Sequence, residues 1–162
     1  MRSAQAEPIS TGEELIRIAQ AGDAEAIGQL IRASIRDTMA AHYSAAFIER
    51  QCAVWSGSHV GRLMQWPDRV MLVATRGREI VGTACLAGNS VRKVFVAPQR
   101  QRAGVGRRLI ERLTRTAIGC GVHVLHVQST INAAGFYARM GFWIADTALV
   151  EGEPFVVMQK NL

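Results

Sequence analysis

The sequence has few cysteines and no long hydrophobic run, and these shortages exclude several classes of protein. Its three cysteines, Cys52, Cys85 and Cys120, are widely spaced without a CxxC pair, so the sequence predicts no metal site and no disulfide framework. Cys85 lies inside an apolar run and is expected to pack as a small buried hydrophobe. No apolar stretch reaches the ~18 residues of a membrane span, and the first ten residues lack the apolar core of a signal peptide. We therefore expect a cytoplasmic protein that does not bind membranes.

Length and composition indicate one globular domain over residues 1–162. Hydrophobic residues make up 49% of the chain and charged residues 20%, the usual balance of a protein that folds without disulfides or a structural metal. The net charge of +6 is unevenly placed, because eight basic residues and a single acid, Glu111, lie between Arg92 and Arg115. Such a stretch attracts phosphate, either on nucleic acid or on a phosphorylated cofactor.

The spacing of apolar residues predicts helices in the first third of the chain and alternating strands and helices after it. The expected helices cover about 11–17 (with Thr11 and Glu14 as a capping box), 23–39, a stretch capped by Ser44, 104–118 and 133–140. The expected strands cover 70–75, 80–87, 90–97, 122–128, 142–150 and 154–158. Segment 56–67, which contains glycine and proline, is expected to be a connection. This order predicts an α/β fold with a mixed sheet.

The most informative segment joins the strand that ends at Pro98 to the helix that begins near Gly104. A polar, basic loop lies between them, and Gly104 and Gly106 open the helix. The first turn of a helix has unpaired N–H groups and the positive end of the helix dipole, and glycine lets a phosphate approach them. The segment has neither the Gly-Lys-Ser/Thr of a nucleotide-hydrolysing loop nor a Gly-x-Gly-x-x-Gly fingerprint. Glycines that serve only tight strand–helix packing are the alternative interpretation.

Two motifs in this order resemble the GNAT acyltransferase superfamily. Gln101-Arg-Ala-Gly104-Val-Gly106 is similar to the family's Q/R-x-x-G-x-G/A signature. Asn132-Ala-Ala-Gly-Phe-Tyr137-Ala-Arg-Met-Gly141-Phe142 is similar to its N-A-x-x-F-Y-x-x-x-G-F segment. The resemblance covers residues 70–162 well and the first 60 only loosely. It implies one GNAT-like domain with a mixed, mostly antiparallel sheet of six to seven strands, flanked by about four helices.

The resemblance also implies a function, the transfer of an acetyl group from acetyl-CoA to a primary amine by direct attack in a ternary complex. The residues it assigns to coenzyme binding are Phe95, Val96, Gln101, Arg102, Ala103, Gly104, Val105, Gly106, Arg107, Asn132 and Tyr137. The N–H of Val96 is the candidate for polarising the thioester carbonyl, and Tyr137 is the candidate acid for the departing thiolate. As alternatives, Tyr137 is an ordinary core aromatic and Asn132 a helix cap.

The general base and the acceptor are less defined. The strand before the loop and its lead-in, residues 89–96, contain no acid, so the candidates are His126, His42, Tyr43 or an ordered water. His42 and Tyr43 are also expected to bind the acceptor, and Phe47 and Trp55 either line the same site or belong to the core. The acceptor stays open between a small amine, an amino acid, an aminoglycoside-like antibiotic and a protein amino group.

Two competing functions follow from the same residues. A catalytically silent acyl-CoA-binding regulatory module is slightly favoured by the missing acid and disfavoured by Tyr137. A nucleic-acid surface is disfavoured because no helix-turn-helix, zinc-finger or ribonucleoprotein signature accompanies the arginines, and the three phosphates of coenzyme A would explain the basic cluster. We therefore expect no nucleic-acid partner. Because members of this family often form homodimers, the resemblance also implies a possible homodimer.

Overall fold

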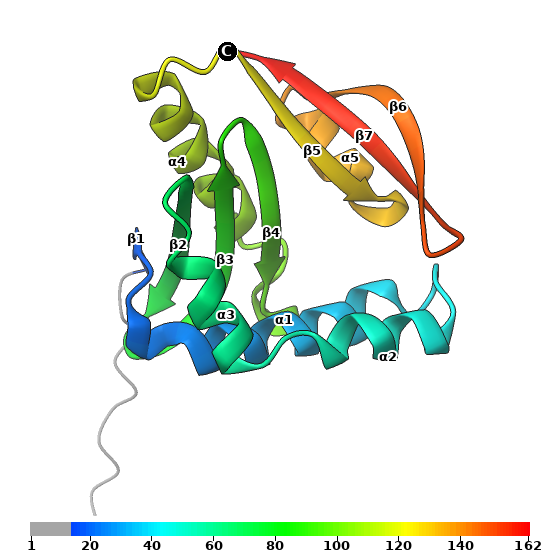
Figure 1. Ribbon diagram of the computed structural model, residues 1–162, viewed down its shortest axis with the longest axis horizontal. Coiled ribbons are helices and arrows are strands. Elements are labelled where there is room, and N and C mark those ends of the chain that lie inside the picture. The colour runs from blue at the N-terminus through cyan, green and yellow to red at the C-terminus, as the bar shows by residue number, and fades with distance from the viewer. Residues whose placement is uncertain (1–13) are drawn as a thin grey trace, which may run out of the picture.

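A mixed sheet forms the centre of the molecule in the computed structural model, which describes residues 14–162 (Figure 1). The seven strands of this part of the chain are β1 (Glu14–Ile18), β2 (Arg69–Arg76), β3 (Glu79–Ala87), β4 (Ser90–Val96), β5 (Val124–Thr130), β6 (Trp143–Val150) and β7 (Glu153–Asn161). Their order in the sheet is β1-β2-β3-β4-β5-β7-β6. Every neighbouring pair is antiparallel except β4 and β5, which are parallel. The predicted α/β fold with a mixed, mostly antiparallel sheet is confirmed.

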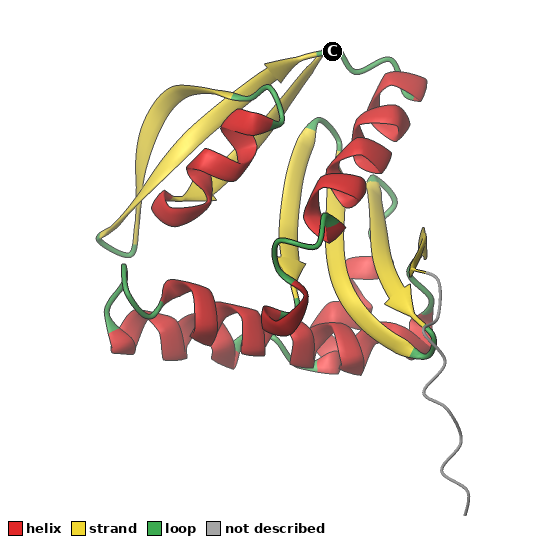
Figure 2. Cartoon of the chain, turned by 180° about the vertical axis from the view of Figure 1, so that it is seen from behind, coloured by secondary structure: helices red, strands yellow, loops and turns green. Residues whose placement is uncertain are grey.

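Helices cover both faces of the sheet (Figures 1 and 2). The five α-helices of the described residues are α1 (Ala24–Met39), α2 (Ala45–Ala53), α3 (Gly57–Met64), α4 (Val105–Gly119) and α5 (Ala134–Arg139). One core cluster lies under α4 and α5 and contains Leu109, Leu113 and Tyr137. A second lies under α1–α3 on the opposite face and contains Ile31 and Phe47. The sheet therefore separates an α4–α5 face from an α1–α3 face.

The segment predicted as a helix over 11–17 is in part an edge strand. β1 pairs antiparallel with β2, with Glu14 opposite Arg76, and Ile16 packs against the core under α4. Thr11, the expected cap, lies outside the described residues. The helix prediction is wrong for 14–17, because hydrogen bonds and apolar contact at an open sheet edge outweigh a local capping signal.

The segment 56–67, expected as a connection, contains helix α3. The Ser56 hydroxyl accepts a hydrogen bond from the His59 N–H at 3.2 Å and caps the helix. A Cβ added to Gly57 would lie 3.1 Å from the Cα of Glu25 in α1. This glycine permits close packing of two helices instead of breaking one, and for that reason composition alone did not reveal α3.

A fork opens in the sheet between β4 and β5. The two strands pair only at Ser90–His126 and Val91–Val127 within the described residues, and they separate beyond these positions. β4 also carries a bulge between Arg92 and Phe95, where Lys93 has a φ of +55°. A parallel pair that breaks after two residues leaves backbone groups of both strands free to bind an extended ligand.

The α1–α2 corner connects the two sides of the fork at its open end. The Tyr43 hydroxyl donates to the Pro154 carbonyl at 3.0 Å and accepts from the Ile131 N–H at 3.0 Å. The Asn132 side-chain amide donates to the Thr38 carbonyl at 3.0 Å. The distance between the fork strands is therefore fixed by α1 and α2 as well as by the sheet.

Candidate functional site

The loop between β4 and α4 leaves open space in front of the helix N-terminus. Gly104 occupies the N-cap position with a φ of +83°, and a Cβ there would contact only the Arg108 side chain, at 3.4 Å. Gln101, Arg102 and Ala103 are exposed. The unpaired N–H groups of the first turn of α4 thus face open space.

Gly106 has a different role from Gly104. A Cβ at Gly106 would lie 3.2 Å from Cζ of Phe136 in α5 and 3.6 Å from Cγ2 of Val96. Gly106 and the neighbouring Val105 are buried. The packing alternative therefore holds at Gly106, which lets α5 approach the first turn of α4.

The arginines beside this loop are not equivalent. Arg108 is ion-paired with Glu14 of β1, which turns its guanidinium toward the sheet edge. The guanidinium of Arg107 lies 3.6 Å from the carboxylate of Glu111 on the exposed face of α4. Arg102 forms no ion pair with any of the described residues. Arg102 is thus the unpaired arginine of this loop. A phosphate near the N-terminus of α4 would compete with Glu111 for Arg107 and with Glu14 for Arg108, whose Nη1 lies beside Gly104.

Val96 presents its backbone N–H to the fork. The N–H of Ala97 donates to the Val81 carbonyl of β3 at 2.9 Å. Backbone groups alternate in direction along a strand, so those of Val96 face away from β3 and toward the fork. The Val96 carbonyl already accepts a hydrogen bond from the Ser34 hydroxyl of α1 at 2.8 Å. Ser34 was not predicted, although a polar residue within the apolar stripe of α1 was a detectable signal.

The backbone groups of Phe95, the preceding residue of β4, face β3 and not the fork. Phe95 is paired with Thr83 of β3, and its half-buried side chain packs against the core under α1–α3. Its backbone is therefore committed to the sheet, whereas that of its neighbour Val96 is not.

Tyr137 belongs to α5, and its ring packs into the core between this helix and the sheet, edge-on to Phe136 and Phe142. Its side chain is 6% exposed, and burial raises its pKa well above the ordinary value. The phenol is therefore protonated at neutral pH. Within residues 14–162 the hydroxyl of Tyr137 forms no hydrogen bond, and its oxygen is not among the fully buried atoms that lack a partner, so it is open to the surface. The hydroxyl of Tyr43 makes two hydrogen bonds.

The structure brings together only some of the residues that were predicted to line the acceptor site. Tyr43, Phe47 and Trp55 are buried in the core under α1–α3, while His42 is exposed after the end of α1. Asn132 does not cap α5, because its amide binds α1 and the N-cap of α5 is Ala133, which makes no side-chain cap. The alternative interpretation of Asn132 as a helix cap is wrong.

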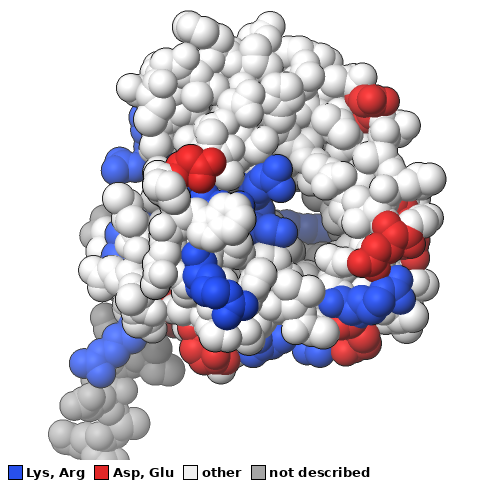
Figure 3. Space-filling model, in the orientation of Figure 1, with Lys and Arg blue, Asp and Glu red and all other residues white. Residues whose placement is uncertain are grey.

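His126 lies on the α1–α3 face, opposite to Tyr137. Its neighbours Leu125 and Val127 belong to the core under α4, so the side chain of His126 points to the other side of the sheet. There a cavity of about 300 Å³ lies at the closed end of the fork, and we call it the fork cleft. Its lining includes Ser90, Arg92, Lys93, His126 and Gln128. Figure 3 shows a hollow on this face of the molecule with basic side chains along one side of it.

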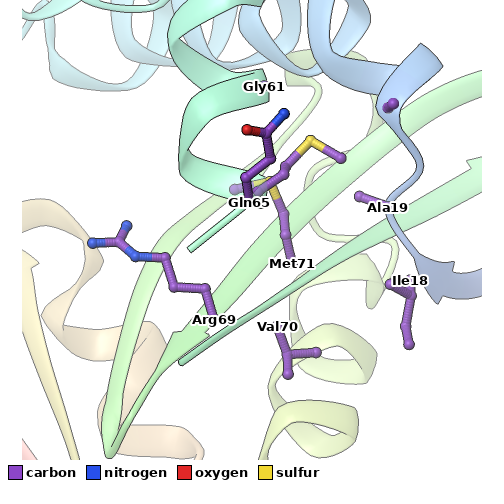
Figure 4. A pocket seen from close by; sticks show the side chains of 9 residues that line it. Ile18, Ala19, Gly61, Gln65, Arg69, Val70 and Met71 are labelled. Atoms are coloured by element: carbon purple, nitrogen blue, oxygen red, sulfur yellow. The ribbon is translucent and has the colours of Figure 1, made fainter. Parts of the chain in front are cut away.

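A second cavity, of about 370 Å³, lies between β1, α3 and β2 (Figure 4). Apolar groups such as Ile18 and Met71 line much of it, together with Gln65 and Arg69. Figure 4 shows the guanidinium of Arg69 extending away from Gln65 and Met71. The predicted site residues do not line this cavity, so it is separate from the candidate site.

Two absences apply to the described part of the chain. Between residues 14 and 162, no group of three or more His, Cys, Asp or Glu side chains could hold a metal ion. No helix of this region is long and apolar enough to cross a membrane.

Several similar solved structures are named acetyltransferases. The family model described as "Acetyltransferase (GNAT) domain" matches residues 43–162. A GCN5-related N-acetyltransferase structure from Rhodopseudomonas palustris is 25% identical, with a TM-score of 0.84, over 96% of this chain and 100% of that one. PaiA N-acetyltransferase from Thermoplasma acidophilum, in complex with coenzyme A, is 22% identical, with a TM-score of 0.81, over 93% and 99% of the two chains.

A further similar structure is YncA from Salmonella typhimurium with its cofactor acetyl-CoA. It is 22% identical, with a TM-score of 0.66, over 92% of this chain and 94% of that one. No curated protein sequence matches this chain. Because the family model covers about three quarters of the residues, the chain belongs to the GNAT acetyltransferase family.

Proposed function

We propose that this protein is an N-acetyltransferase that uses acetyl-CoA to acetylate a primary amine. The observation that carries the proposal is the fork between β4 and β5, with the open N-terminus of α4 beside it, in a member of the GNAT family. Two similar proteins are named N-acetyltransferases, and two were determined with coenzyme A or acetyl-CoA bound.

The coenzyme would enter from the α4–α5 face. In this proposal, N–H groups at 104–106 bind the pyrophosphate, and Gln101, Arg102, Ala103 and Arg107 surround it. The pantetheine arm runs along the free edge of β4 past Phe95 and Val96. Asn132 and Tyr137 flank the opening from the β5 side. The open space beside Gly104 supports this placement.

The proposed reaction transfers the acetyl group in one complex. The acceptor nitrogen attacks the thioester carbonyl carbon, and the N–H of Val96 stabilises the oxyanion that develops. The C–S bond then breaks, and Tyr137 gives its proton to the thiolate, which yields coenzyme A and the N-acetylated amine. Tyr137 recovers a proton from solvent. The raised pKa keeps the Tyr137 phenol protonated until the leaving group departs.

His126 is the proposed final acceptor of the proton that the amine loses. It pairs with Ser90 at the closed end of the fork, six residues along β4 from Val96, which is about 20 Å at ~3.3 Å per residue, so ordered water would carry the proton to it. His126 lies on the α1–α3 face of the fork, opposite to Tyr137, so the acid and the base would act from different sides of the sheet. Tyr43 is less suitable as a base, because its hydroxyl is bound to the Pro154 carbonyl and the Ile131 N–H, and burial raises its pKa. His42 is proposed to contact the acceptor at the exposed end of α1.

Calorimetric titration with acetyl-CoA tests the coenzyme site. Gly104→Asp places a negative charge where the pyrophosphate is proposed to bind, and we expect at least a hundredfold loss of affinity. Gly88→Asp is the matched control, because Gly88 also has a positive φ, of +58°, and open space around it. It lies in the β3–β4 turn, at the other end of β4 from the loop. Equal losses in both variants, or no binding by the native protein, would contradict the assignment.

Release of free thiol from acetyl-CoA in the presence of amines tests catalysis. We expect amine-dependent thiol release and an N-acetylated product identified by mass spectrometry. Tight coenzyme binding with no thiol release for any amine would instead favour the silent regulatory module. The two measurements together therefore separate a failed coenzyme site from a failed enzyme.

A further inference from the structure

The sheet register gathers basic side chains on the α1–α3 face beside the fork. In the sheet, Arg92 of β4 lies opposite Cys85 of β3, which lies opposite Met71 of β2. Cys85 and Met71 both belong to the core under α1–α3. Cross-strand partners share a face of the sheet, so Arg92 points to this side, and so does Arg69, two residues before Met71. The bulge in β4 turns Lys93 to the same side, with its ammonium 4.6 Å from the centre of the Trp55 ring.

These cations have no acidic partners. Arg62, Arg69, Arg92 and Lys93 form no ion pair with any residue in the described range 14–162. Asp68, which precedes Arg69 in the chain, is exposed and unpaired with it. The charges lie close enough to interact. The pKa of Lys93 is lowered first by burial and then by the positive charges of Arg92 and Arg69. Like charges held together without a counterion cost free energy unless a ligand compensates them.

Aromatic and unpaired groups complete the surroundings of this cluster. The guanidinium of Arg69 lies 4.3 Å from the centre of the Trp66 ring, and its Nε is buried without a hydrogen-bond partner among the described residues. His59 lies against Trp55, with 5.3 Å between ring centres. Its pKa is lowered by burial first and then by Arg62, Lys93 and Arg69. Four cations, a buried free donor and two aromatic rings thus lie near one another on this face of the sheet.

We propose that Arg92 and Lys93, with Arg69 beside them, bind an anionic group of the acceptor, so that the acceptor amine carries a carboxylate or a phosphate. This inference rests on the proposed acetyltransferase function. Lys93 and Arg92 line the fork cleft together with His126, the proposed base. Val96 lies four residues from Arg92 along β4, about 13 Å at ~3.3 Å per residue. Arginine and lysine side chains span part of this distance, so an amine near Val96 and an anion near Arg92 fit one small molecule.

The same charges disfavour cationic acceptors. A polyamine or an aminoglycoside would bring several positive charges to a cleft that is lined by Arg92 and Lys93 and has Arg69 beside it. A carboxylate or phosphate gains charge-assisted hydrogen bonds from the guanidinium and ammonium groups. We therefore expect the anionic member of a matched pair of amines to be acetylated about ten to a hundred times more efficiently than the neutral member.

Tryptophan fluorescence tests anion binding independently of turnover. Two of the three tryptophans, Trp55 and Trp66, lie against Lys93 and Arg69, so Trp143→Phe leaves the emission to these two. The protein is saturated with coenzyme A, which occupies the phosphate loop, and titrated with inorganic phosphate and with acetate. We expect a saturable change that disappears when Arg92→Gln and Lys93→Gln are combined. The matched control combines Arg78→Gln with Arg139→Gln, which removes the same charge from exposed, unpaired arginines.

Thiol release with matched amines tests the acceptor assignment. Amino acids are compared with their amides, O-phosphoethanolamine with ethanolamine, and both sets with spermidine, with rates expressed per unprotonated amine. The two pairs distinguish a carboxylate from a phosphate. We expect the anionic member of one pair to be preferred, and the Arg92→Gln, Lys93→Gln variant to lose the preference mainly through a higher KM.

The outcomes separate this inference from the proposed function. Absence of saturable anion binding, or equal binding by the double variant, overturns the anion site. Preference for neutral or cationic amines overturns the acceptor assignment and leaves the acetyltransferase function standing. Saturable binding that depends on Arg92 and Lys93, without acetylation of any amine, overturns the proposed function and leaves the anion site standing.

Discussion

Tyr43 and Tyr137 are equally buried, but their hydroxyl groups differ in hydrogen bonding. Each side chain is 6% exposed. Tyr43 connects the Pro154 carbonyl to the Ile131 N–H through its hydroxyl, whereas the hydroxyl of Tyr137 forms no hydrogen bond within residues 14–162. The Tyr137 oxygen is not among the fully buried atoms that lack a partner, so it is open to the surface although the ring is buried. An oxygen in this position can donate its proton to a bound ligand, and this supports the role proposed for Tyr137.

Removing the Tyr137 hydroxyl should affect catalysis and not folding. For Tyr137→Phe we expect kcat to fall about a hundredfold or more, because the thiolate loses its acid. Coenzyme affinity should be retained, and the free energy of unfolding should change by less than about 0.5 kcal/mol. Because the pKa of Tyr137 is raised, its ionisation should cause no fall in the native rate up to pH 10. Unchanged thiol release at saturating amine would remove Tyr137 from the mechanism.

At the scale of an element, α4 shows how two glycines of one motif can serve different purposes. Gly104 provides the left-handed N-cap in front of open space, while Gly106 makes room for Phe136 of α5. The motif spacing is visible in the sequence, but the neighbour that occupies each position is not. The six-residue motif from Gln101 to Gly106 therefore determines both the geometry of the loop and the contact between α4 and α5.

Substitution of Gly106 tests the packing role within α4. In Gly106→Ala the new methyl would lie 3.2 Å from the Phe136 ring, and we expect the free energy of unfolding to fall by about 1–3 kcal/mol. Gly119→Ala, in the last position of the same helix with nothing within 4 Å, should instead stabilise the protein by about 0.4–1 kcal/mol. Chemical denaturation of both variants checks the opposite signs, and a stabilising Gly106→Ala would contradict the packing role.

At the scale of the whole molecule, the fork is connected at two ends. Its closed end consists of the Ser90–His126 and Val91–Val127 pairs. Its open end is connected by the α1–α2 corner, which contacts the β5–β7 side through Tyr43 and through the hydrogen bond from the Ser44 hydroxyl to Glu153, at 2.8 Å. The opening that would receive the coenzyme is therefore a tertiary property, set by helices distant in sequence from the strands.

The open end can be weakened by removing one oxygen. Tyr43→Phe leaves the Pro154 carbonyl and the Ile131 N–H without their partner, and we expect the free energy of unfolding to fall by about 1–3 kcal/mol. Tyr137→Phe, the same chemical change at the same burial, is the matched control. Chemical denaturation measures both, and equal stability losses would show that the Tyr43 hydrogen bonds do not connect the two sides of the fork.

The local features of this protein were determined by its sequence. Apolar spacing predicted α1, α2, α4 and strands β2 to β7, because burial of a periodic face depends on neighbours within a few residues. The two motifs predicted the fold and the family, which the structure and the comparisons confirm. The prediction was wrong at β1, where an edge strand formed in place of a helix, and at α3, where glycines pack closely instead of breaking a helix.

The tertiary structure decided which residues meet. The tertiary structure placed Tyr137 and His126 on opposite faces of the sheet. Pairing across the sheet put Arg69 on the same face as Arg92 and Lys93, which line the fork cleft. Ser34 reached the Val96 carbonyl from a helix 62 residues away in sequence. The physical reason is that strand register and helix packing depend on contacts between distant segments, and no local pattern of residues specifies them.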